Sequence, residues 1–512
     1  MRSLVIPLVL VLVGLSGCSS SESASEVMPP TATPTTTPVP EVEREFRGVW
    51  IATVANIDWP SEPGLPVAQQ QAEFRHLVDQ IDRLGFNAIV LQVRPTADAL
   101  YASKLEPWSA YLTGQQGQAP SPYYDPLAFA VEEAHKRGIE LHAWFNPYRA
   151  FHPSAQGTQT ATHMSQRRPD LVKTYGDLQW FDPGEPDAAA HSLAVMLDVV
   201  ERYDIDGVHL DDYFYPYPIT DSLDQDVPFP DDPSWAKAQA AGTTLSRDDW
   251  RRKNIDDFVE RLYLSIKATK PHVKFGISPF GIWRPGHPPQ IQGFDQYDKL
   301  YADAKKWLNK GWIDYYTPQL YWAIEQTAQS YPVLLDWWIG ENTHGRHMWP
   351  GQYTSRVGFA PERAWAASEV TEQIRLTRER TGATGTVHFS MQAIEKNANG
   401  IADALAETYA APALVPASPW LDPAVPSAPA VALVGLGGTP YVEMTPADAV
   451  LPAHWIVHRY RPTGGWSTEL LPGWHTTYDL TDPTVTELAV AVVSRVGVEG
   501  PPTRVMTSGV VQ

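Results

Sequence analysis

The residues with the clearest chemical potential lie in the run GVHLDDYF. Val208 and Leu210 alternate there with His209 and Asp211, which predicts a β-strand whose pleat sends His209 and Asp211 to the opposite face from the two apolar side chains. A carboxylate on the inner face of a sheet is costly to bury unless it is hydrogen-bonded or takes part in chemistry. We therefore predict catalytic carboxylates at Asp211 and, at the rim, Asp212. The alternative is an aspartate pair that caps a helix or anchors a loop.

Cleavage of a glycosidic bond needs two carboxyl groups, one to protonate the leaving oxygen and one to attack the anomeric carbon or to activate water. Glu325 follows Gln319 by six residues, in the loop predicted after the sixth strand. We predict that Glu325 is the general acid opposite Asp211, the alternative being a solvated residue at the start of a helix. Weaker candidates are Asp58, Asp98 and Asp336.

A metal site is a second chemical possibility, because a histidine and neighbouring carboxylates can hold a divalent ion. His209 lies next to both aspartates, but a metal-dependent deacetylase would need further histidines at converging strand ends. The histidines on or beside other predicted strands are His142, His344, His347 and His388. None of them has a compact ligand spacing such as HExxH, so we expect neither a metal nor another cofactor.

The overall composition restricts the partners. The chain has 39 Lys+Arg against 59 Asp+Glu, a formal net charge of -20, which disfavours binding to a phosphate backbone. We therefore expect no nucleic-acid partner. The 19 Trp and 22 Tyr are flat, amphipathic rings that suit a ligand with C–H faces and hydroxyl edges, and sugars are the first such ligand to consider.

The elements that must position these residues alternate as strand and helix. Eight short apolar runs, most of them followed by an amphipathic stretch, predict a (β/α)8 barrel with enlarged loops over residues 44–412. The predicted strands are Arg47–Thr53, Ala88–Val93, Glu140–Phe145, Gly207–Asp211, Lys274–Ser278, Asp314–Gln319, His347–Gly351 and Gly385–Phe389. No glycine-rich phosphate-binding motif follows the first strand, which disfavours a dinucleotide-binding sheet.

In such a barrel the reacting groups project from the carboxyl ends of the strands. Aromatic residues are concentrated at these predicted strand ends and loops, where their rings can stack on sugars. They are Trp50, Trp59, Trp144, Tyr213, Tyr215, Trp283, Tyr321, Trp322 and Trp349.

The rest of the chain predicts accessory parts. Residues 413–429 are rich in proline and alanine and predict a linker, whereas residues 430–512 alternate apolar and polar positions between Gly and Pro turns and predict a small all-β sandwich. The final run, SRVGVEGPPTRV, resembles the last hairpin of fibronectin type III domains.

The N-terminus has the layout of a bacterial lipoprotein signal. An apolar run ends at Leu15-Ser16-Gly17-Cys18, which resembles the lipobox, and Cys18 is the only cysteine in the chain. We expect residues 1–17 to be removed, Cys18 to be lipidated, and the Ser/Thr/Pro-rich residues 18–43 to form a tether. The alternative is an ordinary cleaved signal with an incidental cysteine.

Seven motifs in order, EFRGVWIATVANIDWPS, FNAIVLQVRPTADALY, LHAWFNPYR, DGVHLDDYFYPYP, WRRKNIDDFV, FGISPFGIW and YYTPQLYW, resemble the glycosyl-hydrolase-like 10 family of bacterial lipoproteins. The resemblance covers residues 44 to about 410. It implies a barrel that cleaves glycan strands of peptidoglycan. On the matching motifs and strand ends we expect substrate contacts from Trp50, Asn56, Arg94, Asn146, Arg149, His209, Tyr213, Gln319, Tyr321, Trp322 and Trp349. Arg251, Arg252 and Asn254 in WRRKN either orient Asp211 or clamp the long loop before them.

The function that we expect is therefore that of a glycosidase held at the bacterial cell envelope through lipidated Cys18, with peptidoglycan glycan strands as partner. Two alternatives stay open. One is a non-catalytic lipoprotein that binds cell-wall glycan, and the other is a metal-dependent polysaccharide deacetylase.

Overall fold

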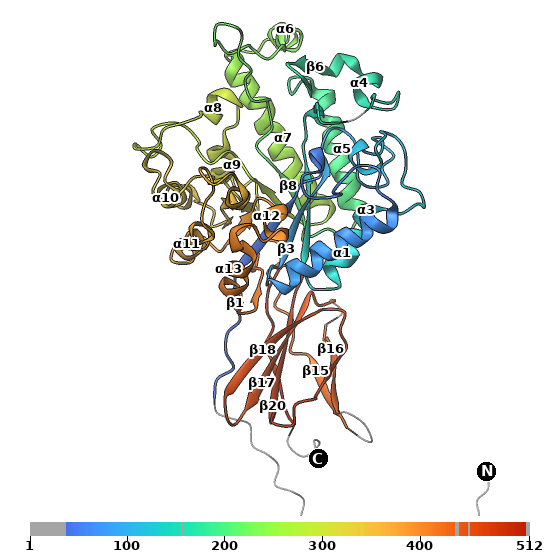
Figure 1. Ribbon diagram of the computed structural model, residues 1–512, viewed down its shortest axis with the longest axis vertical. Coiled ribbons are helices and arrows are strands. Elements are labelled where there is room, and N and C mark those ends of the chain that lie inside the picture. Colours follow the sequence, from blue (N-terminus) through green and yellow to red (C-terminus); the bar gives the residue numbers. More distant parts are fainter. Residues whose placement is uncertain (1–36, 156, 436–439, 449–450, 508–512) are drawn as a thin grey trace, which may run out of the picture.

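The computed structural model describes residues 37–155, 157–435, 440–448 and 451–507. The described chain forms a barrel with a smaller β-sandwich beneath it (Figure 1). The expected signal peptide, Cys18 and most of the expected tether lie outside the described residues. None of the helices in the described ranges is long and apolar enough to span a membrane.

The barrel is built from nine short parallel strands in the order β11-β10-β9-β8-β4-β3-β2-β13-β12. The two edge strands are halves of one segment: β11 pairs with β10, β12 pairs with β13, and only Trp349 and Pro350 separate them. The sheet therefore closes on itself, and the predicted (β/α)8 barrel is confirmed. The strands are β2 (Phe46–Ile51), β3 (Ala88–Arg94), β4 (Glu140–Phe145), β8 (Gly207–Leu210), β9 (Lys274–Ile277), β10 (Tyr315–Tyr316), β11 (His347–Met348), β12 (Gly351–Gln352) and β13 (Gly385–His388).

Two predicted strands differ from the observed ones. The run predicted as Asp314–Gln319 is regular only over the two residues of β10, and the run predicted as His347–Gly351 is interrupted at Pro350. Proline has no backbone N–H to donate, so it interrupts the ladder of hydrogen bonds.

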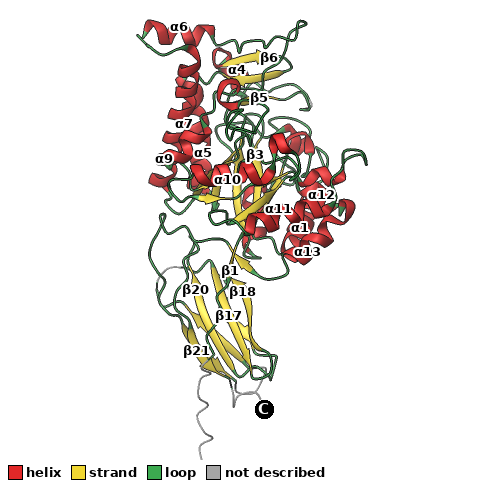
Figure 2. Ribbon diagram, turned by 90° about the vertical axis from the view of Figure 1, so that its left-hand side faces the viewer, coloured by secondary structure: helices red, strands yellow, loops and turns green. Residues whose placement is uncertain are grey.

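Helices cover the outside of the barrel (Figure 2). In α1 the side chains of Phe74, Leu77, Val78 and Ile81 form a buried apolar stripe. The helices are α1 (Val67–Arg83), α2 (Ala110–Thr113), α3 (Pro126–His135), α4 (Met164–Arg167), α5 (Pro186–Arg202), α6 (Asp232–Ala240), α7 (Arg247–Thr269), α8 (Gln296–Lys299), α9 (Ala304–Lys310), α10 (Tyr331–Glu341), α11 (Ala367–Arg378), α12 (Met391–Glu395) and α13 (Ile401–Thr408).

Aromatic rings fill the interior at the amino ends of the strands, which we call the barrel floor. The ring of Trp349 stacks on Phe46 with centroids 3.7 Å apart and on Tyr315 at 4.7 Å. All three side chains are fully buried. The opposite end, at the carboxyl ends of the strands, is the mouth.

Two insertions project on the mouth side. A three-stranded sheet of β5 (Arg149–Phe151), β7 (Leu178–Phe181) and β6 (Val172–Tyr175) follows β4, and α6 lies in the long loop after β8. Figure 2 shows both at the end of the molecule opposite the sandwich. This small sheet was not expected from the sequence patterns.

The C-terminal part is the predicted all-β sandwich. A sheet of order β15-β16-β19 faces a sheet of order β18-β17-β20-β21, and residues from both sheets form one core that includes Val442, Trp455 and Val490. The resemblance to fibronectin type III domains stays a prediction. The strands are β15 (Ala430–Val434), β16 (Tyr441–Thr445), β17 (His454–Arg461), β18 (Gly465–Pro472), β19 (Thr477–Asp479), β20 (Glu487–Val493) and β21 (Thr503–Met506).

The segment predicted as a linker packs against the barrel floor. Its first residues form β14 (Ala413–Leu414), which pairs in parallel with β1 (Glu43–Arg44) at the start of the barrel. Further along, the indole of Trp420 donates to Asp314. The segment therefore joins the sandwich to the floor through specific contacts.

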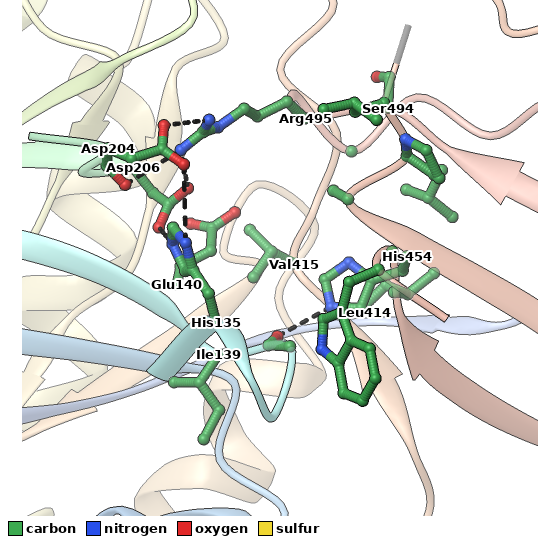
Figure 3. A pocket seen from close by; sticks show the side chains of 18 residues that line it. His135, Ile139, Glu140, Asp204, Asp206, Leu414, Val415, His454, Ser494 and Arg495 are labelled. Carbon is green, nitrogen blue, oxygen red and sulfur yellow. Dashed lines mark hydrogen bonds and ion pairs between the residues drawn. The ribbon is translucent and has the colours of Figure 1, made fainter. Parts of the chain in front are cut away.

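A cavity of about 330 Å³ lies at this junction. Figure 3 shows Arg495 of the sandwich reaching Asp204 and Asp206 of the barrel, with His135 bonded to Asp206 at 2.8 Å. Leu414 and Val415 line its apolar side. The cavity is at the floor, so it is separate from the predicted catalytic residues.

Candidate active site

Asp211 lies directly after β8, and its side chain points into the barrel as the pleat predicts. Both of its carboxylate oxygens accept hydrogen bonds from Asn146 Nδ2, at 2.9 and 2.7 Å. The indole N–H of Trp144 donates to Oδ2 at 3.2 Å, and the backbone N–H of Tyr213 donates to Oδ1 at 3.3 Å. This carboxylate is thus held by donors from β4, from the loop after β4 and from the backbone two residues beyond Asp211.

The orientation of the Asn146 amide follows from a chain of hydrogen bonds. The backbone N–H groups of Thr53 and Val54 donate to Gln92 Oε1. The amide nitrogen of Gln92 must then donate, and it bonds Asn146 Oδ1 at 2.7 Å. The guanidinium of Arg149 donates to the same oxygen at 2.7 Å. Because that oxygen has two donors, the amide nitrogen of Asn146 faces the Asp211 carboxylate.

Asp212 has a different environment. The hydroxyl of Tyr217 donates to Oδ2 in a short hydrogen bond, and the Gln319 side chain lies next to the carboxyl. The other oxygen, Oδ1, has no partner of good geometry among the described residues and is not enclosed. Asp212 is 3% exposed and Asp211 is 4% exposed. Both carboxyls are therefore largely removed from water but still reachable from the mouth.

The two carboxyl groups differ in acidity. Burial raises the pKa of Asp211 to about 6, although Arg149 and the N–H donors oppose this change. Burial, together with the negative charge of Asp211, raises the pKa of Asp212 to about 7. Both changes favour the protonated form, and the pKa is raised further at Asp212 than at Asp211.

This arrangement suits acid–base chemistry. A general acid works best when its pKa is near the working pH, and a neighbouring carboxylate that stays ionised supplies negative charge to a developing cation. Two carboxyl groups in unlike environments are what glycoside cleavage requires.

Aromatic side chains surround the pair at the mouth. The Tyr321 hydroxyl has no hydrogen-bond partner among the described residues, and its oxygen is not enclosed. Burial and the charge of Asp212 raise the pKa of Tyr321 well above its usual value, so this hydroxyl keeps its proton and can donate. The partly exposed rings of this part of the barrel are Tyr213, Tyr217, Phe280, Phe294, Tyr321, Trp322 and Phe389.

Comparison with known sequences identifies the family. Residues 45–367 match the family described as Glycosyl hydrolase-like 10. The chain belongs to this family. Glycosyl hydrolase YngK of Bacillus subtilis (strain 168) is 43% identical over 396 residues, covering 76% of each protein. Glycosyl hydrolase DigH of Escherichia coli (strain K12) is 36% identical over 355 residues, covering 65% of this chain and 78% of DigH.

Solved structures align with this glycosyl hydrolase-like chain at low identity. The glycoside hydrolase domain of PgaB (BpsB) from Bordetella bronchiseptica has 15% identity and a TM-score of 0.46, covering 71% of this chain and 99% of that domain. The catalytic domain of β-amylase from Paenibacillus polymyxa has 10% identity and a TM-score of 0.47, covering 72% and 98%.

Several residues predicted on the motifs of this glycosyl hydrolase-like barrel lie together at the mouth. Asn146, Arg149, Tyr213 and Gln319 contact or flank the two aspartates, and the guanidinium of Arg149 lies 5.1 Å from the centre of the Tyr213 ring. Tyr321 and Trp322 are partly exposed beside them. These six residues stay candidates for substrate contact, and Asn146 and Arg149 also position Asp211.

Three predicted contact residues are structural. Trp349 has both its neighbours in the floor stack and no exposed surface, so it cannot offer a face to a sugar. Arg94 is fully buried and forms an ion pair with Glu106 at 2.5 Å. His209 is also fully buried, where it bonds Trp50 and Ser278. Trp349, Arg94 and His209 are thus corrected from substrate contacts to interior supports.

Trp50 and Asn56 have supporting roles near the mouth. The indole of Trp50 donates to His209 one layer below the aspartates, and its side chain is only 2% exposed. The amide of Asn56 donates to the carbonyl oxygens of Pro60 and Tyr111. Asn56 also lines a cavity of about 210 Å³ with Tyr111 and Ser154.

No hydrogen bond or ion pair among the described residues joins Glu325 to the aspartate pair. Glu325 is exposed in the loop after β10, and among the described residues it has neither a hydrogen-bond nor an ion-pair partner. The role of general acid predicted for Glu325 therefore stays a prediction.

The weaker carboxylate candidates have other partners. Asp58 accepts from the backbone of Ala52 and from Ser390, so it ties two loops together. Asp98 is buried beneath its own loop, where Thr96 donates to it. Asp336 forms a surface ion pair with Arg380.

The WRRKN motif clamps the long loop. Arg251 bonds Asp231 and the hydroxyl of Tyr301, and Arg252 bonds Asp249. None of these contacts reaches Asp211, which decides between the two roles considered for the motif.

The alternative of a histidine-carboxylate metal site has no support in the described ranges. They contain no group of three or more His, Cys, Asp or Glu side chains arranged to hold a metal ion. Burial lowers the pKa of His209 well below its usual value, and its ring nitrogens bond protein groups.

Sequence reasoning missed three residues that shape the site. Tyr217 lies in the YFYPYP run, but nothing in that run indicates which of its rings bonds Asp212. Trp144 was expected to stack on sugars and instead donates to Asp211. Gln92, which orients Asn146, has only its position on the inner face of β3 as a signal.

Proposed function

We propose that this protein is a glycoside hydrolase of the bacterial cell envelope that cleaves peptidoglycan glycan strands. Asp211 and Asp212 carry the acid–base chemistry in this proposal. The observation that carries it is the pair of adjacent buried carboxyls at the barrel mouth, one bonded by N–H donors and the other by a hydroxyl. Membership of the glycosyl hydrolase-like 10 family supports the reaction class.

The choice of peptidoglycan rests on the sequence. The lipobox-like end of the signal supports a location outside the cytoplasmic membrane, with Cys18 as the lipid anchor, and the cell wall is a glycan polymer of that compartment. The aromatic rings around the pair suit the apolar faces of its sugars.

The position of the N-terminal segment fits an anchored enzyme. β1 lies at the barrel floor beside the sandwich, so the chain enters at the end opposite the mouth (Figure 1). A protein attached through its N-terminus would thus present the aspartate pair away from the attachment.

The test is mass spectrometry of soluble fragments from purified peptidoglycan, both intact and stripped of stem peptides by an amidase. The protein is compared with Asp211→Asn and with the matched surface variant Asp336→Asn. We expect fragments from the protein and from Asp336→Asn, but not from Asp211→Asn. If no form releases fragments while all of them co-sediment with the glycan, the protein is a binding protein and the proposal is wrong.

The same assay decides which residue is the acid. We expect Asp212→Asn to lower the rate by about 10²-fold or more, the range for loss of a general acid. A loss of that size in Glu325→Gln, with Asp212→Asn active, would return the role to Glu325.

A further inference from the structure

We propose that the barrel cleaves glycosides of 2-acetamido sugars with the substrate's own acetamido oxygen as the nucleophile, Asp212 as the acid and base, and Asp211 as a fixed negative charge. This inference rests on the proposed function and deepens it, since it names the group that the substrate must carry.

Asp211 is poorly placed to attack the anomeric carbon of the substrate. A nucleophilic carboxylate needs a free lone pair directed at the anomeric carbon. Both oxygens of Asp211 instead accept hydrogen bonds from Asn146, and each accepts one more, from Trp144 or from Tyr213. These bonds use the acceptor positions of the carboxylate and lower its nucleophilicity, but they leave its charge in place.

With Asp212 as the acid, the carboxyls and thiols of the described residues supply no second nucleophile at the site. Asp212 and Asp211 are the carboxyls that affect each other here, and Glu325 is exposed without a partner in the described part of the chain. A sequence with one cysteine, at position 18, has no thiol in the barrel. An enzyme that proceeds through two displacements must then take its nucleophile from the substrate, and substrate-assisted glycosidases provide the chemical precedent.

The hydroxyl of Tyr321 is available to bind the substrate. It is close enough to Asp212 and Asp211 to respond to their charges, and it has no partner among the described side chains. A donor in this position can bond the carbonyl oxygen of an acetamido group and direct it towards the anomeric carbon. We assign Tyr321 as a positioning residue for that group.

The proposed reaction consists of two displacements at the anomeric carbon, C1. The acetamido oxygen forms a bond to C1 while the glycosidic C1–O bond breaks, and the proton of the Asp212 carboxyl passes to the leaving oxygen. The product is a cyclic oxazolinium ion, whose positive charge the Asp211 carboxylate stabilises. Water then attacks C1 and gives a proton to Asp212. This attack opens the oxazolinium ring and restores the acetamido group. The net reaction is hydrolysis with retention of configuration at C1.

The test compares three forms of one glycan strand, with the 2-amino group acetylated, trifluoroacetylated or free. We expect the acetylated strand to be cleaved. The other two should react at least about 10²-fold more slowly, because the nucleophile is weakened in the trifluoroacetylated strand and missing in the free amine. Equal cleavage of all three would overturn this inference and leave the proposed function intact. Cleavage of none of them would overturn the proposed function itself.

Two further measurements separate the nucleophiles. Proton NMR of fresh products should show retained configuration, whereas inversion would overturn the inference. A 2-fluoro glycoside, which lacks the acetamido group, should leave the intact protein mass unchanged; a covalent adduct on Asp211 would show that Asp211 is the nucleophile.

The role of Tyr321 has a matched control on the neighbouring ring. Tyr353 stacks on Tyr321 with centroids 5.0 Å apart. We expect Tyr321→Phe to lower kcat on the acetylated strand about tenfold and Tyr353→Phe to leave it unchanged. The same loss on a substrate without an acetamido group, or no loss in Tyr321→Phe, would contradict the assignment.

Discussion

The side-chain amide of Asn146 donates to both carboxylate oxygens of Asp211, at 2.9 and 2.7 Å, while its own oxygen accepts from Gln92 and Arg149. Gln92 and Arg149 thus fix the orientation of Asn146, and Asn146 in turn fixes the orientation of the Asp211 carboxylate. Burial, together with the charge of Asp211, in turn raises the pKa of the neighbouring Asp212.

The isosteric change Asn146→Asp should replace the attraction between residue 146 and Asp211 by repulsion. It replaces a donor by a second carboxylate facing Asp211, so the pKa of Asp211 should rise further, by about one pH unit or more. We expect kcat/KM to fall about 10²-fold and its acidic limb to move to higher pH, both measured in a pH profile. A lower rate with an unmoved acidic limb would mean that Asn146 only supports the fold.

The pH dependence of the protein itself should be bell-shaped and narrow. Asp211 must be ionised, with a pKa of about 6, and Asp212 must be protonated, with a pKa of about 7. Activity should therefore rise with pH through about 6 and fall above about 7, in two steps that belong to the pair. Measuring kcat/KM from about pH 4 to 9 checks this, and activity that still rises at about pH 8 would contradict it.

Asp212 should lower the stability of the folded protein at alkaline pH. Its pKa in the folded chain lies above the usual value of 3.8, so its ionisation disfavours the folded state, and stability falls as the pH rises from about 4 through about 7. Asp212→Asn should thus be more stable than the parent at about pH 8, by up to about 4 kcal/mol, and should differ little at about pH 4. Urea unfolding at both pH values measures the difference.

The control for this stability measurement is Asp336→Asn, which removes an exposed carboxylate from a surface ion pair. It should change the free energy of unfolding by less than about 1 kcal/mol at about pH 8. A parent protein that is more stable than Asp212→Asn at that pH would contradict the expected cost of burying this group.

Two tryptophans should respond in opposite ways to truncation. Trp349→Ala opens a cavity in the floor stack and should cost about 3–5 kcal/mol of stability without changing KM. Trp322→Ala should raise KM about tenfold, equivalent to ~1.4 kcal/mol, with little effect on stability. Thermal unfolding and steady-state kinetics of both variants distinguish these effects; a raised KM in a stable Trp349→Ala would restore Trp349 as a substrate contact.

The barrel and the position of Asp211 could be predicted because both depend on local patterns. The alternation in GVHLDDYF places Val208 and Leu210 among the residues packed against the helices and His209 in the interior, as observed. Parallel strands then bring their carboxyl ends to one side, whatever the loops do.

The errors concern properties that local patterns do not contain. Trp349 lies within the predicted strand His347–Gly351 and was expected at the mouth, but the observed strand stops after two residues and the ring stacks on Phe46 at the floor. The partner of Asp212 comes from a proline-rich loop whose path the sequence does not reveal. The role predicted for Glu325 stays a prediction, because its distance along the chain does not determine whether the side chain turns towards the aspartates or towards water.

The pairing of β1 with β14 has a mechanical consequence. The two strands run parallel beneath the barrel, and Arg47 adds hydrogen bonds to the carbonyl oxygens of Tyr409 and Ala411. Tension applied to the N-terminal segment therefore acts along the strand direction and is shared by several bonds at once. It passes into the barrel at the floor without crossing the aspartate pair, so a chain pulled by its attachment would keep the geometry of its mouth.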